Sequence, residues 1–248
     1  MKLRVLGSSS SGNSYLLQST TGEVLALEAG IRFDKVKQAV NFNIANIVGC
    51  CITHEHGDHA KYAKDFIDAY IPVYMSSGTC EALQLSPASC AQCVKPFTEL
   101  RIGSFRAMPF PVQHDAAQPF GWLIQHPECG NVLFATDTYY IKYRFPKLSN
   151  ILIECNYRLD LLQHNVQRGS IDHKRYARTI ESHMSYETCL STLLANDLSK
   201  VNNIVLIHLS ADNSNACEFT QSIANATGKQ NVFAASPGTE IDFNKTPF

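Results

Sequence analysis

The segment Thr53-His54-Glu55-His56-Gly57-Asp58-His59, which follows the apolar run at residues 47–52, is the most informative part of this chain. It places three histidines and two acidic residues in seven positions. Neutral imidazole nitrogens and carboxylate oxygens are ligands for divalent transition metals. Four potential ligands within six residues indicate a metal site rather than a solvated loop with scattered histidines. The spacing excludes a zinc helix of the HExxH type, because the second histidine comes two residues after the first.

The apolar run predicts a buried strand over residues 47–53, because it is rich in apolar and β-branched side chains. His54 and His56 leave the carboxyl end of this strand two residues apart, so their side chains can point the same way. Gly57 would then permit a sharp turn. The strand therefore presents a pair of histidines at one edge of a sheet.

A helix is expected over residues 61–67, with Asp58 at its N-cap position. The turn before this helix would bring Asp58 and His59 back over the first histidine pair. Two pairs of ligands, offset by one turn, suit two adjacent metal ions.

The composition predicts a single domain covering residues 1–248. A hydrophobic fraction of 45% in 248 residues is ample for one core, and no linker or charge block divides the chain. The N-terminus turns polar after six residues, and no apolar stretch approaches the roughly 20 residues that span a bilayer. Nine scattered cysteines, an odd number, indicate reduced thiols. We therefore expect a soluble, cytoplasmic protein without a membrane partner.

Two basic clusters stand out against the net charge of −1. The first contains Arg168, Lys174, Arg175 and Arg178. The second contains the basic residues of segment 142–147. Isolated surface cations are usually only solvated, but clusters of this kind can also contact a polyanion.

The remaining pattern alternates strands and helices. Strands are predicted at residues 3–6, 14–18, 23–28, 47–53, 71–75, 99–102, 105–112, 120–125, 132–135, 151–153, 203–207 and 232–235. Helices are predicted at residues 34–42, 61–67, 79–85, 172–181, 186–196 and 216–226. Strand-rich segments in both halves, each followed by helices, predict an α/β fold in which two sheets stack face to face with helices outside, a four-layer αββα sandwich.

Further candidate ligands follow three other predicted strands. His114, Asp137 and His208 each come just after a strand. Chemistry in α/β sheets gathers at the carboxyl ends of strands. A single histidine at such a place is usually structural, but three independent strand ends with His, Asp and His indicate a shared site.

Together these motifs resemble the metallo-β-lactamase superfamily. The matching segments are residues 53–59, His114, Ala135-Thr136-Asp137-Thr138 and Ile207-His208-Leu209-Ser210, and the resemblance runs through nearly the whole chain. It implies the metallo-β-lactamase fold. It also implies two divalent metal ions, one held by His54, His56 and His114, a second held by Asp58, His59 and His208, with Asp137 bridging them.

Differences between this chain and other branches of the superfamily limit the reactions that we expect it to catalyse. Position 137 is aspartate, where the best-known zinc β-lactamases carry cysteine, so antibiotic hydrolysis is not expected. The interval of 71 residues from Asp137 to His208 is too short for the large inserted domain of the ribonuclease J branch. Segments 7–14, 110–116, 153–157 and 182–185 resemble the WalJ/YycJ (VicX) branch, which is similar to small DNA exonucleases. Segment 182–185 departs from the usual Gly-His-Leu-Ser-Asn of that branch.

The leading hypothesis is a metal-dependent phosphodiester hydrolase, a nuclease of the DNA exonuclease type with nucleic acid as its substrate. Two divalent ions lower the pKa of a water between them and neutralise charge on the attacked and leaving oxygens. We expect Asp58 to orient or deprotonate that water, and His183 to donate a proton to the leaving oxygen or to contact a phosphate. The expected substrate-binding residues are Ser11, Gly12, Asn13, Lys174 and Arg175.

Two alternatives remain. One is a hydrolase for a small phosphodiester or for a thioester, as in glyoxalase II, and the other is a metal-binding regulatory protein without turnover. The His/Asp ligand set suits zinc, manganese or iron, and affinity order alone does not choose among them. No motif of the chain indicates the oligomeric state, the polarity with which a nucleic acid strand would be cleaved, or the preferred nucleic acid.

Overall fold

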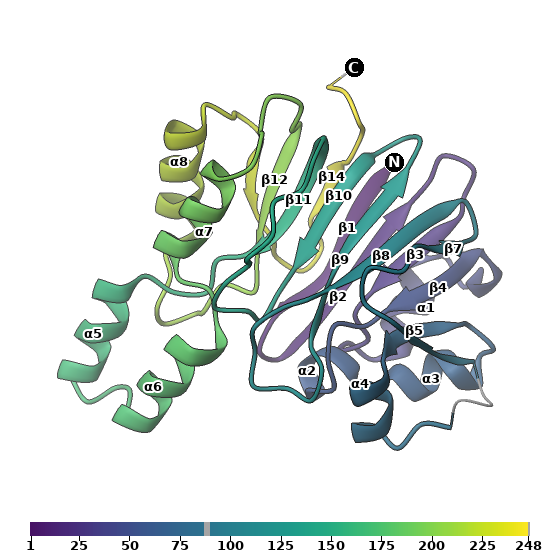
Figure 1. Ribbon diagram of the computed structural model, residues 1–248, viewed down its shortest axis with the longest axis horizontal. Coiled ribbons are helices and arrows are strands. Elements are labelled where there is room, and N and C mark those ends of the chain that lie inside the picture. Colours follow the sequence, from purple (N-terminus) through teal and green to yellow (C-terminus); the bar gives the residue numbers. More distant parts are fainter. Residues whose placement is uncertain (87–89, 248) are drawn as a thin grey trace.

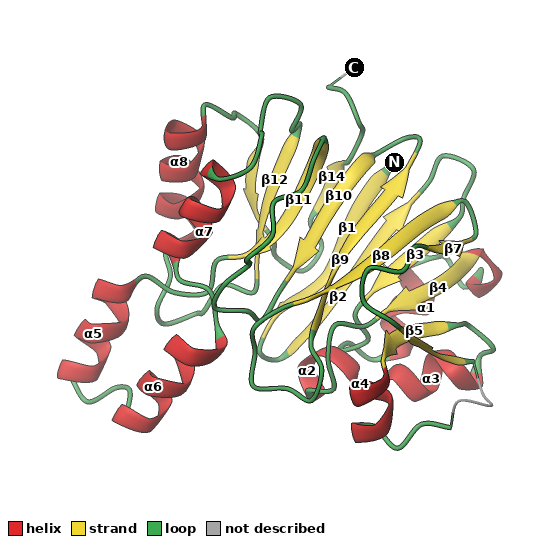
Figure 2. Cartoon of the chain, in the orientation of Figure 1, coloured by secondary structure: helices red, strands yellow, loops and turns green. Residues whose placement is uncertain are grey.

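Two seven-stranded sheets stack face to face with helices on their outer sides (Figures 1 and 2). This arrangement was obtained as a computed structural model that describes residues 1–86 and 90–247. The predicted four-layer αββα sandwich is confirmed.

The first sheet has the strand order β14-β1-β2-β3-β4-β5-β6. Its strands are β1 (Lys2–Ser9), β2 (Gly12–Gln18), β3 (Val24–Leu27), β4 (Ile47–Cys51), β5 (Val73–Ser76), β6 (Ala91–Val94) and β14 (Glu240–Asp242). Strands β3 to β6 run parallel to one another, so their carboxyl ends lie on one edge.

The second sheet has the order β13-β12-β11-β10-β9-β8-β7. Its strands are β7 (Leu100–Ile102), β8 (Phe105–Pro111), β9 (Phe120–His126), β10 (Gly130–Ala135), β11 (Leu148–Glu154), β12 (Asn203–Ile207) and β13 (Val232–Ala234). Strands β10 to β13 are parallel, and β7 to β9 extend the sheet as antiparallel strands.

The helices are α1 (Phe33–Ala39), α2 (Gly57–Ala60), α3 (Ala63–Asp68), α4 (Ser77–Ala82), α5 (Leu159–Gln167), α6 (His173–Ser182), α7 (Tyr186–Leu194) and α8 (Ala216–Thr227), with a short 3₁₀ turn at Ile44–Asn46. Helices α1 and α3 pack on the first sheet through Phe33 and Phe66. Helices α7 and α8 pack on the second sheet through Leu193 and Phe219. Helices α5 and α6 form a separate pair at one end of the molecule (Figure 1).

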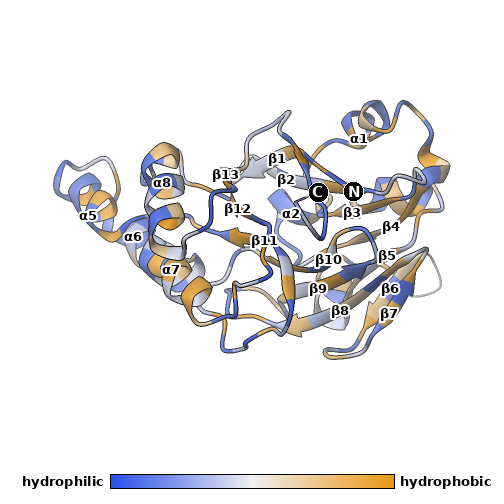
Figure 3. Cartoon of the chain, turned by 90° about the horizontal axis from the view of Figure 1, so that it is seen from above, coloured by the Kyte–Doolittle hydropathy of each residue, from blue (hydrophilic) through white to orange (hydrophobic). Residues whose placement is uncertain are grey.

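The main core lies between the two sheets. Tyr15 of the first sheet meets Phe134 of the second with ring centroids 5.6 Å apart, and Trp122 is fully buried beside them. Two further apolar clusters lie outside the sheets, under the helices. In Figure 3 the strands carry much hydrophobic colour, whereas α6 is largely hydrophilic. No helix in the described ranges is long and apolar enough to cross a membrane.

The structure corrects several expected element boundaries. The prediction that Asp58 is an N-cap was wrong, because α2 begins at Gly57 with His56 as its N-cap. The single helix expected at residues 61–67 is interrupted at Tyr62, where the backbone leaves the helical region and α3 begins. The strand expected at residues 47–53 ends at Cys51. Helix α5 and the edge strands β6 and β14 were not predicted.

Candidate metal centre

All seven candidate ligands meet at the edge where parallel strands of both sheets end. His54 and His56 follow β4, Asp58 and His59 lie in α2, and His114, Asp137 and His208 follow β8, β10 and β12. Their ligand atoms form two groups in which all atoms lie within 4.8 Å of one another: His54, His56 and His114, and then Asp58, His59, Asp137 and His208. The fold therefore gathers the sequence-predicted set at one place.

In the first group, ring nitrogens converge on a common point. His54 Nε2 lies 3.0 Å and His114 Nε2 lies 3.1 Å from His56 Nδ1. The other nitrogen of His114 donates to the backbone carbonyl of Ser182 at 2.9 Å, which fixes the tautomer and leaves Nε2 with a free lone pair. On His54, the equivalent partner of Nδ1 is the Thr53 hydroxyl at 2.9 Å.

Asp137 lies between the two groups. Its Oδ2 is 3.3 Å from His59 Nε2, 3.7 Å from His114 Nε2 and 3.9 Å from His54 Nε2. Its Oδ1 contacts His208 Nδ1. One carboxylate that faces imidazoles of both groups has the arrangement expected of a shared ligand.

The donor set fits two divalent cations. Nitrogen lone pairs that face each other at hydrogen-bond distance need a cation or a proton between them. Five buried or half-buried imidazoles with two carboxylates supply N and O ligands of the type that zinc, manganese and iron accept. The buried His59 Nδ1 and Glu28 Oε1 atoms also lack hydrogen-bond partners, although they lie 3.7 Å apart. A metal on His59 Nε2 would favour a proton on Nδ1 for Glu28 to accept.

The electrostatic environment keeps His54, His114 and Asp137 in the ionisation states that metal ligands need. Burial lowers the pKa of both His54 and His114, so their imidazoles are neutral. Burial alone would raise the pKa of Asp137, but His208 and His59 beside it hold the pKa well below its usual range. Asp137 is therefore an ionised carboxylate in a buried position.

Three residues at this edge adopt left-handed backbone conformations without being glycine. The φ angles are 67° at Glu28, 47° at Asp137 and 54° at His208, each just after a strand. Such a conformation costs of order 1–3 kcal/mol and persists where surrounding contacts impose it. Ser8 Oγ accepts the His208 amide at 2.9 Å, and Asn156 Nδ2 donates to the His208 carbonyl at 2.7 Å.

Two buried glutamates support the site and had no role in the sequence-based prediction. Glu28 follows β3, accepts the Thr53 amide at 3.4 Å and faces His59. Glu154 ends β11, and its Oε2 accepts the amides of Thr138 at 2.9 Å and Met184 at 3.1 Å. Their only signal was an acidic residue at the end of an apolar strand, which predicts a position but no partner.

His183 is held by Glu154 at the side of the metal centre. Its Nδ1 donates to Glu154 Oε1 at 2.7 Å, so Nε2 is free to act on another group. Burial would lower the pKa of His183, but the Glu154 carboxylate and, more weakly, Asp137 raise it to about 9. His183, Asp137, Glu154 and His208 also form a third group whose atoms are close enough for a metal.

An open cavity of about 740 Å³ leads to the centre. Its lining includes Ser9 to Ser11, the candidate ligands His56, Asp58, His114, Asp137 and His208, and also Arg175, Arg178 and His183. Of the expected substrate-binding residues, Ser11 and Arg175 line the cavity. Gly12, Asn13 and Lys174 are not part of the lining, and Asn13 Nδ2 instead contacts His59 Nε2 at 3.1 Å.

Close packing around α2 requires glycine at position 30, whereas the sequence suggests a need for glycine at position 57. Gly57 does not adopt a left-handed backbone, and an added Cβ there would meet no atom within 4 Å. At Gly30, a Cβ would lie 1.7 Å from the Asp58 carbonyl oxygen. Glu55 makes a contact in the same segment, because its Oε1 accepts the Ala117 amide at 2.7 Å.

Comparison with known proteins places this geometry in a family. Residues 33–209 match the Beta-lactamase superfamily domain. The chain is 28% identical over 228 residues to exodeoxyribonuclease YycJ of Bacillus anthracis, covering 85% of this chain and 83% of that protein. It is 26% identical over 258 aligned positions to exodeoxyribonuclease WalJ of Streptococcus pneumoniae, covering 98% of this chain and 92% of that protein.

The fold agrees with this match. The crystal structure of the metallo-beta-lactamase fold protein YhfI from Bacillus subtilis superposes with a TM-score of 0.74 at 17% identity, covering 97% of this chain and 98% of that one. The family match includes every one of the seven candidate ligands. The chain therefore belongs to the beta-lactamase superfamily, as a hydrolase-family member with the metallo-β-lactamase fold.

Proposed function

We propose that this protein is a metal-dependent phosphodiester hydrolase that acts on DNA as an exonuclease. The observation that carries this proposal is the cavity itself: two adjoining ligand groups with Asp137 between them lie at its base, and the arginines of α6 line its side. Phosphodiester cleavage needs charge neutralisation at the attacked phosphate and cationic contacts along a polyanion. The likeness to relatives named exodeoxyribonucleases supports DNA as the substrate.

The expected metal ligands are the seven residues of the two groups. Bound divalent ions would lower the pKa of the attacking water and offset charge on the phosphate oxygens. Asp58 is the carboxylate with the best access to that water, because its side chain is 23% exposed while Asp137 is 3% exposed. Its Oδ2 atom orients the water or accepts its proton.

His183 supplies the proton for the leaving oxygen. Glu154 holds Nδ1, so the proton that is transferred leaves from Nε2, and the raised pKa keeps the ring protonated at neutral pH. The side chain is 22% exposed and lines the cavity, which gives it access to a bound phosphodiester.

Arg175 and Arg178 contact the substrate phosphates. Both line the cavity from α6, and both make exposed ion pairs, Arg175 with Asp212 at 3.6 Å and Arg178 with Asp115 at 3.5 Å. Exposed pairs of this kind are worth only about 0–1 kcal/mol, so a phosphate can replace the carboxylates. The hydroxyl groups of Ser9 to Ser11 offer further polar contacts in the cavity lining.

A small phosphodiester is the second candidate substrate. A cavity of about 740 Å³ is within the range that holds small ligands, roughly 300–1,000 Å³. Metal-reconstituted protein should therefore be assayed on end-labelled DNA, bis-p-nitrophenyl phosphate and S-lactoylglutathione. Shortening of the DNA from an end supports the proposal, whereas thioester turnover without DNA cleavage, or metal binding without any turnover, contradicts it.

The basic cluster provides a matched pair of variants for this assay. Arg175→Ala with Arg178→Ala removes two cations that line the cavity, whereas Arg168→Ala with Lys174→Ala removes two exposed cations that do not. We expect the first pair to lose at least tenfold in kcat/KM on DNA and the second pair to lose less than twofold. Equal losses would show that only the net charge of the basic cluster matters.

We further propose that residues 1–248 act as one domain in the cytoplasm. Strand β14 pairs with β1, which joins the two ends of the chain in one sheet. All nine cysteines are free thiols, as is usual in a reducing compartment.

A further inference from the structure

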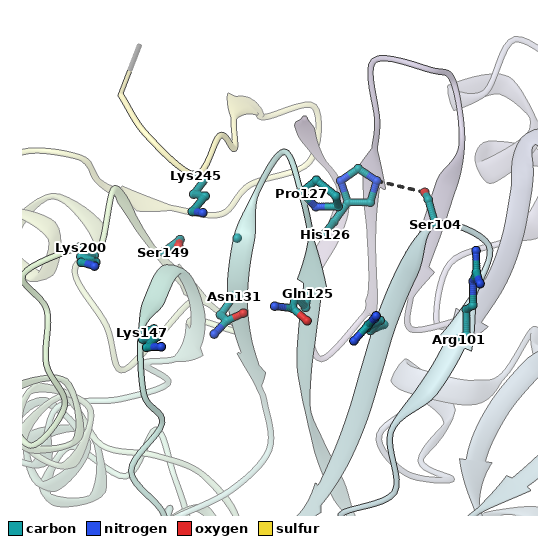
Figure 4. Close-up of a pocket in the computed structure, with 12 residues that line it drawn as sticks. Arg101, Ser104, Gln125, His126, Pro127, Asn131, Lys147, Ser149, Lys200 and Lys245 are labelled. Atoms are coloured by element: carbon teal, nitrogen blue, oxygen red, sulfur yellow. Dashed lines mark hydrogen bonds between the residues drawn. The ribbon is translucent and has the colours of Figure 1, made fainter.

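A second cavity, of about 630 Å³, lies at the end of the second sheet opposite the metal centre. We call it the basic groove. Its lining residues are Arg101, Ser104, Arg106, Gln125, His126, Pro127, Gly130, Asn131, Lys147, Ser149, Lys200 and Lys245 (Figure 4). None of these residues is acidic, although the chain as a whole has a net charge of −1.

The five cations of the groove come from separate parts of the chain. Arg101 lies on β7 and Arg106 on β8, Lys147 precedes β11, Lys200 precedes β12, and Lys245 follows β14. Figure 4 shows them spread across the strands, with Lys200 and Lys147 on one side and Arg101 on the other. All five are exposed. A row of separated cations suits a ligand with repeating negative charges.

Few of these cations are already neutralised. Arg106 lies 3.4 Å from Glu99, in a pair whose side chains are both about 60% exposed. For the other four, no carboxylate of the described residues lies within ion-pair distance. The nearby carboxylate of Glu23 bonds to Ser104, which in turn contacts His126 Nε2 at 3.0 Å. The groove is therefore electropositive at neutral pH.

The sheet surface here is built for a polar ligand. Arg101 pairs with Arg106, Arg106 with Gln125, and Gln125 with Asn131 across neighbouring strands, so these side chains form one row on the outer face. Further along the sheet, the outer faces of β11 and β12 carry apolar residues under α7 and α8 instead. Small-molecule sites are mostly apolar and enclose their ligand. This row of exposed polar groups is neither apolar nor enclosed.

A chain segment that is also positively charged connects the basic groove to the metal centre. Residues 139–147 run from just beyond Asp137 to Lys147 and contain no acidic residue. Lys142 and Arg144 are exposed on this segment, and Tyr139 and Tyr140 are exposed at its beginning. Along β10 and the two residues after it, the six steps from Asn131 to Asp137 span roughly 20 Å, and the eight steps from Arg106 to His114 span roughly 26 Å.

We propose that the basic groove is a second binding site for the phosphate backbone of the DNA whose end lies in the metal centre. This inference rests on the proposed function. At about 3.4 Å per base pair, the separation corresponds to about six to eight base pairs from the cleaved end. The groove then makes binding depend on substrate length, and contacts to the backbone alone make it independent of sequence.

The test compares DNA of two lengths on a groove variant and a matched control. The groove variant is Lys147→Ala, Lys200→Ala and Lys245→Ala. The control is Lys35→Ala, Lys37→Ala and Lys64→Ala, three lysines on α1 and α3 outside the first sheet, of which Lys35 and Lys64 are exposed and Lys37 is half-buried. Both variants lose the same charge. Binding of fluorescent phosphorothioate duplexes of 4 and 20 base pairs is measured by anisotropy between 50 and 200 mM salt, which needs no hydrolysis.

We expect the groove variant to bind the 20-base-pair duplex at least tenfold more weakly, with the slope of log K against log salt reduced by about 2 to 3. Its affinity for the 4-base-pair duplex should stay within twofold of the original protein, and the control should match the original protein on both lengths. An unchanged affinity for the long duplex, or an equal loss in the control, overturns the proposal. An equal loss on the short duplex overturns it in favour of a small-anion site. Failure of the proposed nuclease function is a separate result, seen as no cleavage of unmodified DNA of either length.

Discussion

At the scale of single residues, the centre depends on carboxylates that orient histidines. Glu154 fixes His183, and Glu28 faces His59. Each glutamate is fully buried, and Glu154 makes three hydrogen bonds with its two oxygens. A buried carboxylate is stable only with such partners. The hydrogen bond between Glu154 and His183 Nδ1 thus sets which nitrogen of that ring faces the cavity.

The role of His183 predicts a dependence on the leaving group. We expect His183→Asn to reduce kcat on DNA by about 10²- to 10⁴-fold, because the alkoxide leaving group needs a proton. On bis-p-nitrophenyl phosphate the loss should be far smaller, since nitrophenolate leaves without one. His173→Asn, an exposed histidine of α6 outside the cavity lining, is the control. Metal content, measured by mass spectrometry, should be unchanged; a lost ion would identify His183 as a ligand.

The raised pKa of His183 predicts the alkaline limit of activity. The ring must be protonated to donate, so a folded-state pKa of about 9 keeps the donor active at neutral pH and loses it as the pH rises through that value. In Glu154→Gln the carboxylate that raises the pKa is absent. The alkaline limb of the kcat profile should then move to lower pH, toward the ordinary histidine value of about 6.5. Identical alkaline limbs in the two proteins would contradict this assignment.

At the scale of elements, α2 reaches the sheet edge because it packs against backbone. The Ala29 amide donates to the His59 carbonyl at 2.7 Å, and Gly30 leaves room for the Asp58 carbonyl. This contact explains why the ligands Asp58 and His59 lie over the β4 histidines although Asp58 is not a helix cap.

Gly30→Ala tests this packing, with Gly57→Ala as its counterpart. The added methyl group at position 30 would lie 1.7 Å from the Asp58 oxygen, so α2 must shift. We expect a loss of about 2 kcal/mol or more, which is roughly 4–8 °C in the unfolding midpoint, together with weaker metal binding. Gly57→Ala should leave the midpoint unchanged within about 2 °C, because it meets open space in a helical conformation. Calorimetry of both variants measures the two unfolding midpoints. Equal midpoints would refute the packing argument.

Much of the fold and the ligand set could be predicted from local patterns. His114, Asp137 and His208 each follow a buried strand, and strand ends share one edge of an α/β sheet. Glu28 and Glu154 could not be assigned partners, because their contacts join segments that are far apart in sequence. Helix α5 was not predicted, and Leu162 is its only fully buried residue.

At the scale of the whole molecule, the two sheets divide the ligands between them. The first sheet contributes the four candidate ligands of segment 54–59, and the second contributes His114, Asp137 and His208. The centre therefore lies across the seam of the sandwich, above the core formed by Tyr15, Phe134 and Trp122. Any ion held by ligands from both sheets links the two halves of the fold.

Metal removal should consequently destabilise the whole domain. An ion present at 100 times its dissociation constant adds about 2.7 kcal/mol to the free energy of unfolding, because the unfolded chain does not assemble the site. For a chain of this size, that corresponds to roughly 5–10 °C in the unfolding midpoint. We expect a chelator to lower the midpoint by this amount and added zinc or manganese to restore it, as measured by scanning calorimetry.

Asp137→Asn is the control that links this effect to the seam. Its carboxylate faces imidazoles of both ligand groups, so losing its charge should weaken metal binding and shrink the shift caused by the chelator. Without metal, the variant also loses an ionised group whose pKa is held low by His59 and His208, which should lower the midpoint of the metal-free protein. A chelator shift that is as large in the variant as in the original protein would mean that the stabilising ion binds elsewhere. The two halves of the sandwich would then be joined by their apolar core and by hydrogen bonds between the sheets, such as the one from the His208 amide to Ser8.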